Sequence, residues 1–186
     1  MHPLEKFRYC PCCGSDRFLV ATEKSKQCED CGFELFMNPS AAVAAFITNK
    51  RGELLVCRRA KEPAKGTLDL PGGFCDIGET VEEAIRREVM EETHISLAEI
   101  NYLFSLPNSY MYSGLPIPTL DMFFEGTVSA LTDIHADDDA IELLWLRKED
   151  INPAEFGLDS IRKAVSLWKR WPLHKEKVID SPTFNH

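Results

Sequence analysis

Residues 73–95 read GFCDIGETVEEAIRREVMEETHI, a glycine turn followed by an amphipathic helical pattern, and this stretch decides the fold. Thr80 and Glu83 form a Thr-x-x-Glu capping box, which satisfies exposed N–H groups at a helix start. The sequence therefore predicts a helix from Thr80 to about Thr93. Its buried stripe is expected to consist of the apolar residues at helical spacing, which are Val81, Ala84, Ile85 and Val89.

Three glutamates of this helix, Glu88, Glu91 and Glu92, stand three and four positions apart and therefore share one face. Like charges at that separation cost a helix about 0.2–0.5 kcal/mol per pair, and a bound divalent cation would remove this repulsion. Hard cations such as Mg²⁺ take carboxylate, water and phosphate oxygens as ligands. An ordinary solvated face is the alternative, since the helix also offers the favourable pairs Glu82 with Arg86 and Glu83 with Arg87.

The spacing of this stretch resembles the Nudix box, the signature of the Nudix hydrolases. The matching positions are Gly73, Glu79, Arg87, Glu88, Val89, Glu91, Glu92 and Ile95, which meet eight of the nine fixed positions. His94 stands where the family has glycine. A left-handed residue normally closes a helix there, and it costs a non-glycine residue about 1 kcal/mol. His94 is interpreted as a surface cap rather than as a metal ligand.

The resemblance implies an α/β fold, namely an α/β/α sandwich with a mixed sheet, and a hydrolase that uses Mg²⁺ or Mn²⁺. Carried over by position, the implied metal ligands are Glu88, Glu91, Glu92 and the backbone carbonyl of Gly72. Glu91 is alternatively the group that takes a proton from the attacking water. Arg87 is implied to act in catalysis by orienting the glutamates and Glu79. Glu142 is favoured as a further metal ligand outside the box, with Glu125 and residues 137–139 as alternatives.

Four of the seven cysteines predict a second metal site. Cys10 and Cys13 form one C-x-x-C pair, Cys28 and Cys31 form another, and fourteen residues separate them. This spacing is typical of a zinc ribbon with a closed, structural Zn²⁺. Residues 1–38 are therefore expected to form a small N-terminal zinc ribbon, residues 39–175 the Nudix domain and residues 176–186 a loosely held tail.

The ribbon placed directly before the box is similar to the NADH pyrophosphatase branch of the family. Two features depart from that branch: its long N-terminal domain is missing, and its substrate signature is replaced at residues 105–113, where Ser105 and Pro107 keep the pattern. NADH, FAD, ADP-ribose and similar nucleoside diphosphate derivatives therefore remain the expected substrates. Aromatic residues near the site could stack on a base, and the candidates are Phe74, Tyr110 and Tyr112. Arg58 and Arg59 end a strand near the expected mouth of the site; they are expected to be solvent-exposed, and contact with a substrate phosphate is the alternative.

Hydrophobic periodicity predicts strands on both sides of the box helix and a second helix at the end. The expected strands are 41–47, 53–58, 68–73, 101–106, 119–129 and 141–146, and the final helix is 158–171. This order of elements suggests a mixed sheet between helices. Cys57 is expected to be a small, buried core residue within the second strand.

The net charge of −9 argues against general nucleic-acid binding. A capped RNA end is the one nucleic-acid substrate that the sequence leaves open. The sequence shows no apolar leader and no run of membrane length, so a soluble cytoplasmic protein is expected. The family resemblance also favours a homodimer. A regulatory module that senses a ligand and contacts a partner through the ribbon is the alternative to an enzyme, and the intact set of Glu88, Glu91 and Glu92 favours the enzyme.

Overall fold

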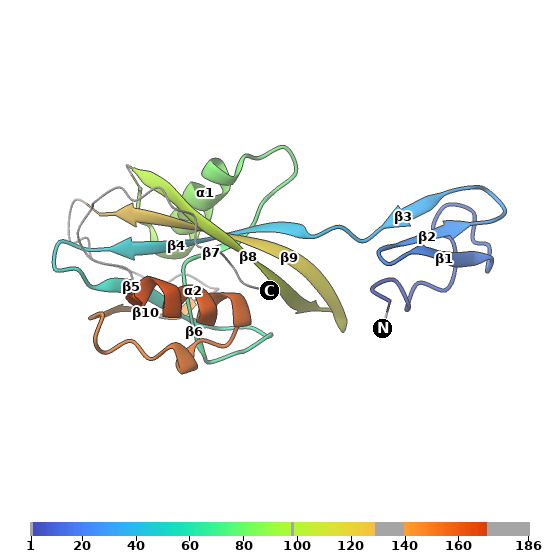
Figure 1. Cartoon of the computed structure of the whole chain (residues 1–186). Coiled ribbons are helices and arrows are strands. Elements are labelled where there is room, and N and C mark those ends of the chain that lie inside the picture. Colours follow the sequence, from blue (N-terminus) through green and yellow to red (C-terminus); the bar gives the residue numbers. More distant parts are fainter. Residues whose placement is uncertain (1, 98, 129–139, 171–186) are drawn as a thin grey trace.

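The computed structural model describes residues 2–97, 99–128 and 140–170. The sequence-based expectations for residues 137–139, for Trp171 and for the tail at 176–186 lie outside these ranges. Within them, the chain forms a small sheet at the N-terminus and a larger sheet between two helices (Figure 1).

The N-terminal module contains three short antiparallel strands, in the order β1 (Phe18–Thr22), β2 (Ser25–Cys28) and β3 (Glu34–Phe36). Its small core consists of Cys10, Phe18 and Cys28, with Phe7 and Leu35 packed against them. The main domain begins with β4 (Ser40–Thr48), which leaves this module through a short connection (Figure 1). The division of the chain at residue 38 lies in that connection and stays a prediction.

The main sheet is mixed, as predicted. Its principal strands run in the order β10 (Ala140–Leu146), β5 (Leu54–Arg59), β4, β9 (Leu115–Thr127) and β8 (Ile100–Tyr112). β4 and β9 are parallel, and the other pairs are antiparallel. Two short strands pair beside this path, β6 (Leu68–Asp69) with β5 and β7 (Gly72–Phe74) with β4.

Alternate residues of β4 bury themselves on opposite faces of the sheet, which creates two separate cores. Ala44 and Phe46 pack toward α2 (Asp159–Arg170), where the ring of Phe46 stacks on Trp168 at 5.5 Å. Val43, Ala45 and Ile47 pack instead toward α1 (Val81–Thr93). The two helices therefore cover opposite faces, which confirms the α/β/α sandwich (Figure 1).

Both predicted helices are present with nearly the expected bounds. The capping box at Thr80 is complete, because the Thr80 hydroxyl accepts from the Glu83 N–H and the Glu83 carboxylate accepts from the Thr80 N–H. In α2 the buried residues include Ile161, Ala164, Val165 and Trp168. A single-turn 3-10 helix, η1 (Pro153–Glu155), precedes α2 and was not predicted.

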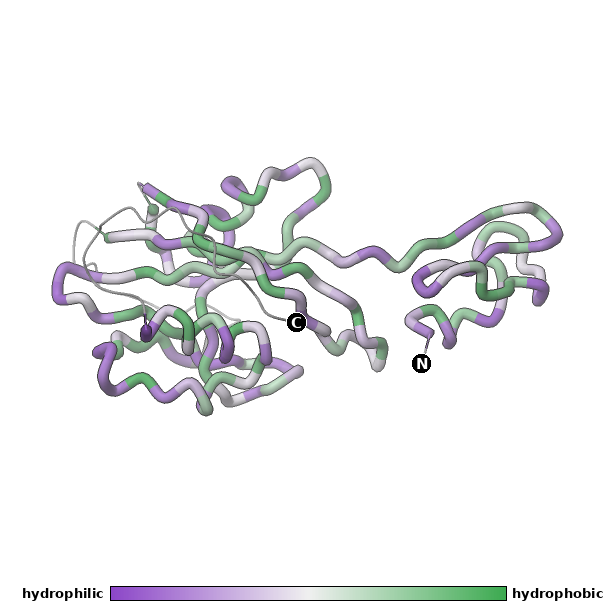
Figure 2. The backbone as a smooth tube through the Cα atoms, in the orientation of Figure 1, coloured by the Kyte–Doolittle hydropathy of each residue, from purple (hydrophilic) through white to green (hydrophobic). Residues whose placement is uncertain are grey.

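The strands differ from the predictions mainly in length. Residues 68–73 form two short strands rather than one, since Leu70 and Pro71 interrupt the pairing. β8 extends six residues beyond the predicted end at Leu106 and forms a long hairpin with β9, with Ser113 and Gly114 at the turn in left-handed conformations. Hydrophobic residues run through the central strands, whereas the turn between β4 and β5 is hydrophilic (Figure 2).

No helix within the described ranges has the length and apolar character needed to cross a membrane.

Candidate functional site

The glycines of β7 bring the backbone into direct contact with the acidic face of α1. The N–H of Gly72 donates to the Glu92 carboxylate over 3.0 Å. A Cβ atom at Gly73 would lie 2.5 Å from Cδ of Glu88 and 2.6 Å from both of its carboxylate oxygens. A side chain at Gly73 would therefore occupy the space that holds the Glu88 carboxylate, and a side chain at Gly72 would clash with the backbone of β4.

Arg87 is the centre of the acidic cluster. Its guanidinium donates to both carboxylate oxygens of Glu79 at 2.9 Å, to Glu88 at 2.8 Å and to Glu91 at 3.2 Å. A fourth partner is the backbone carbonyl of Phe74, at 3.0 Å. Paired planar donors of this kind fix carboxylates in defined orientations. Arg87 thus contacts Glu79, Glu88 and Glu91 at once, and its role in catalysis stays a prediction.

The side chain of Glu88 is largely buried, with 16% exposed, whereas that of Glu91 is 59% exposed. Burial raises the pKa of the Glu88 carboxyl, the hydrogen bond from Arg87 opposes this, and the charges of Glu91 and Glu79 add to the rise. A carboxyl whose ionised form is disfavoured by burial and by like charges gains from a neighbouring cation. The chemistry of these residues therefore fits a divalent metal ion.

The three glutamates do not converge on a single point in this structure. Glu92 is turned toward Gly72, and Glu88 and Glu91 are held by Arg87. In the part of the chain that the structure describes, the four cysteines form the only group of three or more potential metal ligands whose atoms lie within 4.8 Å of one another.

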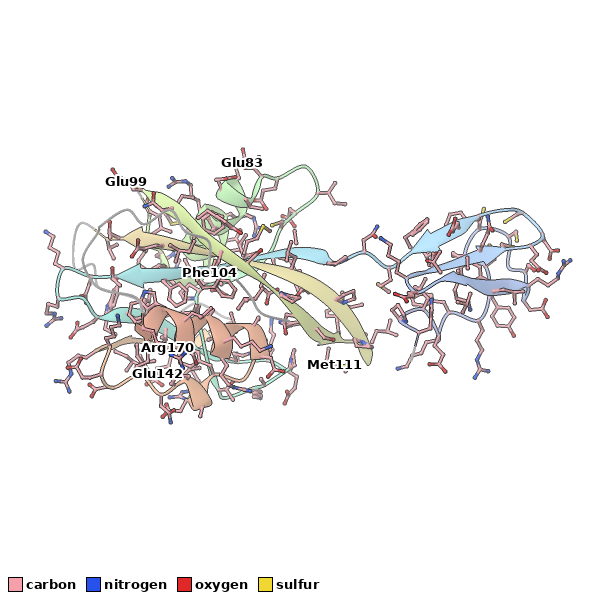
Figure 3. The ribbon with its side chains drawn as sticks, in the orientation of Figure 1. Glu83, Glu99, Phe104, Met111, Glu142 and Arg170 are labelled. Carbon is pink, nitrogen blue, oxygen red and sulfur yellow. The ribbon has the colours of Figure 1, made fainter. Side chains whose placement is uncertain are left out.

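The structure does not bring Glu142 to this cluster. Glu142 pairs in register with Arg58 of β5, and its carboxylate accepts from the Arg58 guanidinium at 3.1 Å. Its neighbours at alternate positions, Leu144 and Leu146, pack against the core under α2. Glu142 is therefore on the α2 side of the sheet, and Glu83 of α1 is on the other side (Figure 3). Glu125 faces the same side as Phe123, which also belongs to the α2 core.

A cleft opens beside β7, between the sheet and the start of α2. Gly72, Gly73 and Phe74 line one wall, and Tyr110 of β8 faces them. The rings of Phe74 and Tyr110 meet edge to face, with centroids 5.4 Å apart. Two of the three predicted aromatic candidates thus come together at this cleft. Tyr112 lies two residues further along, at the exposed end of the hairpin, and does not line the cleft.

Arg59 lines the same cleft and differs from its expected solvent exposure, since only 15% of its side chain is exposed. It forms an ion pair with Asp69, donates to the Tyr110 hydroxyl at 3.1 Å and donates to the backbone carbonyl of Pro63 at 2.7 Å. Burial raises the pKa of the Asp69 carboxyl, and Arg59 opposes this rise. Arg59 therefore holds Tyr110 in place. Arg58, by contrast, is only partly buried and pairs with Glu142.

A second polar group in the cleft was missed from the sequence. The Asp121 carboxylate of β9 is buried and accepts from Asn108 at 3.0 Å, from Thr119 at 2.6 Å and from Ser160 of α2. Asn108 and Asp121 both line the cleft. The available signal was an aspartate at an inward position of a largely apolar strand, which indicates a buried polar group that needs partners.

The four cysteines of the N-terminal module lie together at the ends of two similar turns. The Sγ atoms of Cys10 and Cys31 are 3.7 Å apart, and those of Cys13 and Cys28 are 3.6 Å apart. A tetrahedron with Zn–S distances of about 2.3 Å has edges of about 3.8 Å, so this spacing fits a bound zinc ion. A disulfide would need about 2.05 Å. The cysteine cluster thus has the arrangement that a zinc ribbon requires.

Backbone N–H groups favour the ionised form of the Cys28 thiol, whereas the neighbouring thiols raise the pKa of Cys31 to about 12. The N–H groups of Cys31 and Asp30 lower the pKa of the Cys28 thiol to about 6. Glycine follows each C-x-x-C pair in a left-handed conformation, and its N–H donates to the carbonyl of the first cysteine of the pair. Cys12 is exposed and outside the cluster. Cys57 is buried in β5, as the sequence suggested.

The sequence matches the NUDIX domain family over residues 38–168. Among curated relatives, the NAD-capped RNA hydrolase NudC of Haemophilus influenzae (strain PittGG) is 32% identical over 117 residues, covering 59% of this chain and 44% of the relative. The ADP-ribose pyrophosphatase of Methanocaldococcus jannaschii is 30% identical over 137 residues, covering 74% of this chain and 79% of the relative. The chain thus spans less than half the length of the NudC relative.

Solved structures show the same fold. The crystal structure of a NUDIX hydrolase from Nitrosomonas europaea superimposes with a TM-score of 0.67 and covers 87% of this chain and 90% of that one, at 20% identity. At that identity the likeness concerns the fold alone. It agrees with the sandwich described above.

Proposed function

The chain belongs to the NUDIX domain family, and we propose that it is a metal-dependent pyrophosphohydrolase that cleaves the diphosphate linkage of a nucleoside diphosphate derivative. The observation that carries this proposal is the Arg87-centred glutamate cluster at the edge of an aromatic-lined cleft. ADP-ribose, NADH and FAD are the proposed substrates. The relatives named as ADP-ribose pyrophosphatase and NAD-capped RNA hydrolase support this choice.

Glu88 and Glu92 are the proposed ligands of Mg²⁺ or Mn²⁺, with Glu91 and the carbonyl of Gly72 as further ligands. A divalent ion, when bound, neutralises phosphate charge and lowers the pKa of a bound water. Glu91 is the most exposed of the three glutamates and is the one best placed to take a proton from the attacking water. Glu142 remains a proposed ligand only if the chain around β10 rearranges, because here it pairs with Arg58.

The reaction adds water across one P–O bond of the diphosphate and releases two phosphate monoesters. Gly72 and Gly73 touch the glutamates and also line the cleft. A base held beside Phe74 and Tyr110 would therefore place its diphosphate close to Glu88. Arg87 would keep Glu88 and Glu91 oriented during the attack.

We propose a structural role for zinc at Cys10, Cys13, Cys28 and Cys31. The short sulfur–sulfur distances and the paired glycine turns support it. The module is too small for a large core of its own, so metal binding would supply much of its folding free energy.

We also propose that the protein forms a homodimer. β8 is an edge strand of the main sheet, and its thirteen residues, INYLFSLPNSYMY, include no charged side chain. Exposed edge strands usually carry charges that prevent pairing with other chains, so an uncharged edge favours a covering partner. Light scattering at several concentrations would measure the oligomeric state.

The decisive experiment is a substrate panel with Mg²⁺ or Mn²⁺, containing ADP-ribose, NADH, FAD, NAD-capped RNA and nucleoside triphosphates. At least one compound with a diphosphate linkage should be hydrolysed. Glu88→Gln should lower kcat by about a hundredfold or more, since a metal ligand loses its charge. Glu82→Gln is the matched control on the exposed first turn of the same helix, and it should retain activity.

Binding of these compounds without turnover would contradict the proposed enzyme and favour a ligand-sensing module. Equal turnover by Glu88→Gln and wild-type protein would contradict the assignment of Glu88.

A further inference from the structure

The cleft presents a polar wall whose chemistry is separate from that of the glutamate cluster. Asn108 of β8 lies on this wall, two residues before Tyr110 and on the same face of the strand. Its side chain is partly buried and donates through Nδ2 to the Asp121 carboxylate at 3.0 Å. Asn108 belongs to the segment where the sequence departs from the NADH pyrophosphatase signature.

Asp121 fixes the direction in which the Asn108 amide points. A carboxylate only accepts hydrogen bonds, so the NH₂ group of Asn108 must face Asp121 and its oxygen must face the other way. Asp121 is itself held by the Thr119 hydroxyl at 2.6 Å and by the Ser160 hydroxyl of α2. These partners are buried, and they leave the carboxylate little freedom to turn.

The Oδ1 atom of Asn108 accepts no hydrogen bond from any residue in the ranges 2–97, 99–128 and 140–170. A partly buried acceptor in a cleft is best satisfied by a donor on the ligand. The cleft also contains the carboxylates of Asp69 and Asp121 against a single guanidinium, that of Arg59. This excess of negative charge disfavours a phosphate beside Asn108 and favours an uncharged group that carries N–H donors.

We propose that Asn108 is a specificity-determining residue whose Oδ1 accepts a hydrogen bond from an amino group of the nucleobase, and that Asp121 is the positioning residue that keeps this oxygen turned toward the base. The inference rests on the proposed function, in which the base occupies the cleft beside Phe74 and Tyr110. The hydrogen bond to Oδ1 of Asn108 selects adenine over hypoxanthine, because deamination of adenine replaces its 6-amino donor with a carbonyl acceptor that would face Oδ1.

The test compares ADP-ribose with its hypoxanthine counterpart, inosine diphosphate ribose, using the full chain with Mg²⁺. Wild-type protein should prefer ADP-ribose by about tenfold or more in kcat/KM, because the wrong base leaves two acceptors facing each other. Asn108→Leu should bring this ratio to within about threefold, with the change mainly in KM for ADP-ribose. Asn101→Leu, an exposed asparagine at the other end of the same strand, is the matched control and should leave the ratio unchanged.

Asp121→Asn separates positioning from a structural role. An amide at position 121 can donate to Asn108, which lets the Asn108 amide turn over and present its NH₂ group to the base. The preference should then shift toward inosine diphosphate ribose, whereas a merely structural defect would lower activity on both substrates equally. Thermal unfolding of each variant would show whether it is folded. If Asn108→Leu is not folded, Asn108→Ala provides a second variant.

Equal hydrolysis of the two substrates by wild-type protein would overturn the inference and leave the proposed function intact. Absence of hydrolysis for both would overturn the proposed function. In that case calorimetric binding of the two nucleotides still tests the inference, since the same preference for adenine is expected in Kd and equal affinities would refute it.

Discussion

Replacing Gly73 with alanine would put a methyl group where the carboxylate of Glu88 now lies. The added Cβ would be 2.5 Å from Cδ of Glu88 and 2.6 Å from each oxygen. Carbon atoms pack comfortably at about 3.5 Å, so the carboxylate would have to move by about 1 Å. Displacement of a catalytic group by that distance can lower the rate by about a hundredfold. We therefore expect a comparable fall in kcat for Gly73→Ala with ADP-ribose and Mg²⁺.

The fold should tolerate this change, because the clash is with the free end of a flexible side chain and the backbone of Gly73 is not left-handed. Gly72→Ala is the matched comparison. There the added Cβ would lie 2.1 Å from the Val43 carbonyl oxygen and 2.7 Å from Ala44 Cα, on a residue with φ of 151°. Strand backbone cannot move aside as easily, so a loss of about 3 kcal/mol is expected.

The assay pairs steady-state kinetics with thermal unfolding. For a chain of this size, about 3 kcal/mol corresponds to a fall in Tm of about 10 °C, which Gly72→Ala should show and Gly73→Ala should not. Two results would refute the reasoning. One is Gly73→Ala retaining more than a third of the wild-type kcat, and the other is an equal loss of Tm in both variants.

The remaining predictions concern the Arg87 network, the helix end and the zinc module. Arg87 holds the pKa of the Glu79 carboxyl below its ordinary 4.5, so the Glu79 contribution to stability is present above about pH 4.5 and is lost as the pH falls through the lowered pKa; Tm measured from pH 7 to pH 3 should fall less steeply in Glu79→Gln. His94 has φ of 56°, and His94→Gly should raise Tm by about 2–4 °C because it removes about 1 kcal/mol of left-handed strain. Circular dichroism melts would measure this change, and an unchanged Tm would contradict the prediction. Chelation should release about one zinc ion per chain and unfold the N-terminal module, as metal analysis and limited proteolysis would record; protein purified under mild conditions without any zinc would contradict this.

The features that the sequence predicted well depend on neighbouring residues. The capping box at Thr80, the left-handed His94 and the cysteine turns all involve groups within a few positions of one another. Their geometry follows from local backbone rules that any helix end or metal turn obeys. The contact of Arg87 with Glu91 likewise fits the i,i+4 spacing of a helix, whereas its contacts with Glu88 and Glu79 were implied by the family resemblance.

The cleft could not be predicted in the same way, because it collects residues that are far apart in the chain. Arg59 and Asp121 come from β5 and β9, and Ser160 reaches Asp121 from α2. Glu142 shows the related difficulty of assigning a face to a strand residue. The register of β10 on β5 is irregular between Ala140 and Glu142, and a shift of one residue exchanges the two faces.

The position of β7 suggests how chemistry and specificity are divided in this protein. Its two glycines contact the glutamates of α1 and also border the cleft that contains Asn108 and Tyr110. Changes among the glutamates should therefore act mainly on kcat, because they alter groups beside the reacting phosphorus. Changes in the cleft should act mainly on KM and on the choice of base, because they alter contacts that persist from the bound substrate to the transition state. A variant at Asn108 that lowered kcat equally for every substrate would show that the two regions are not separate.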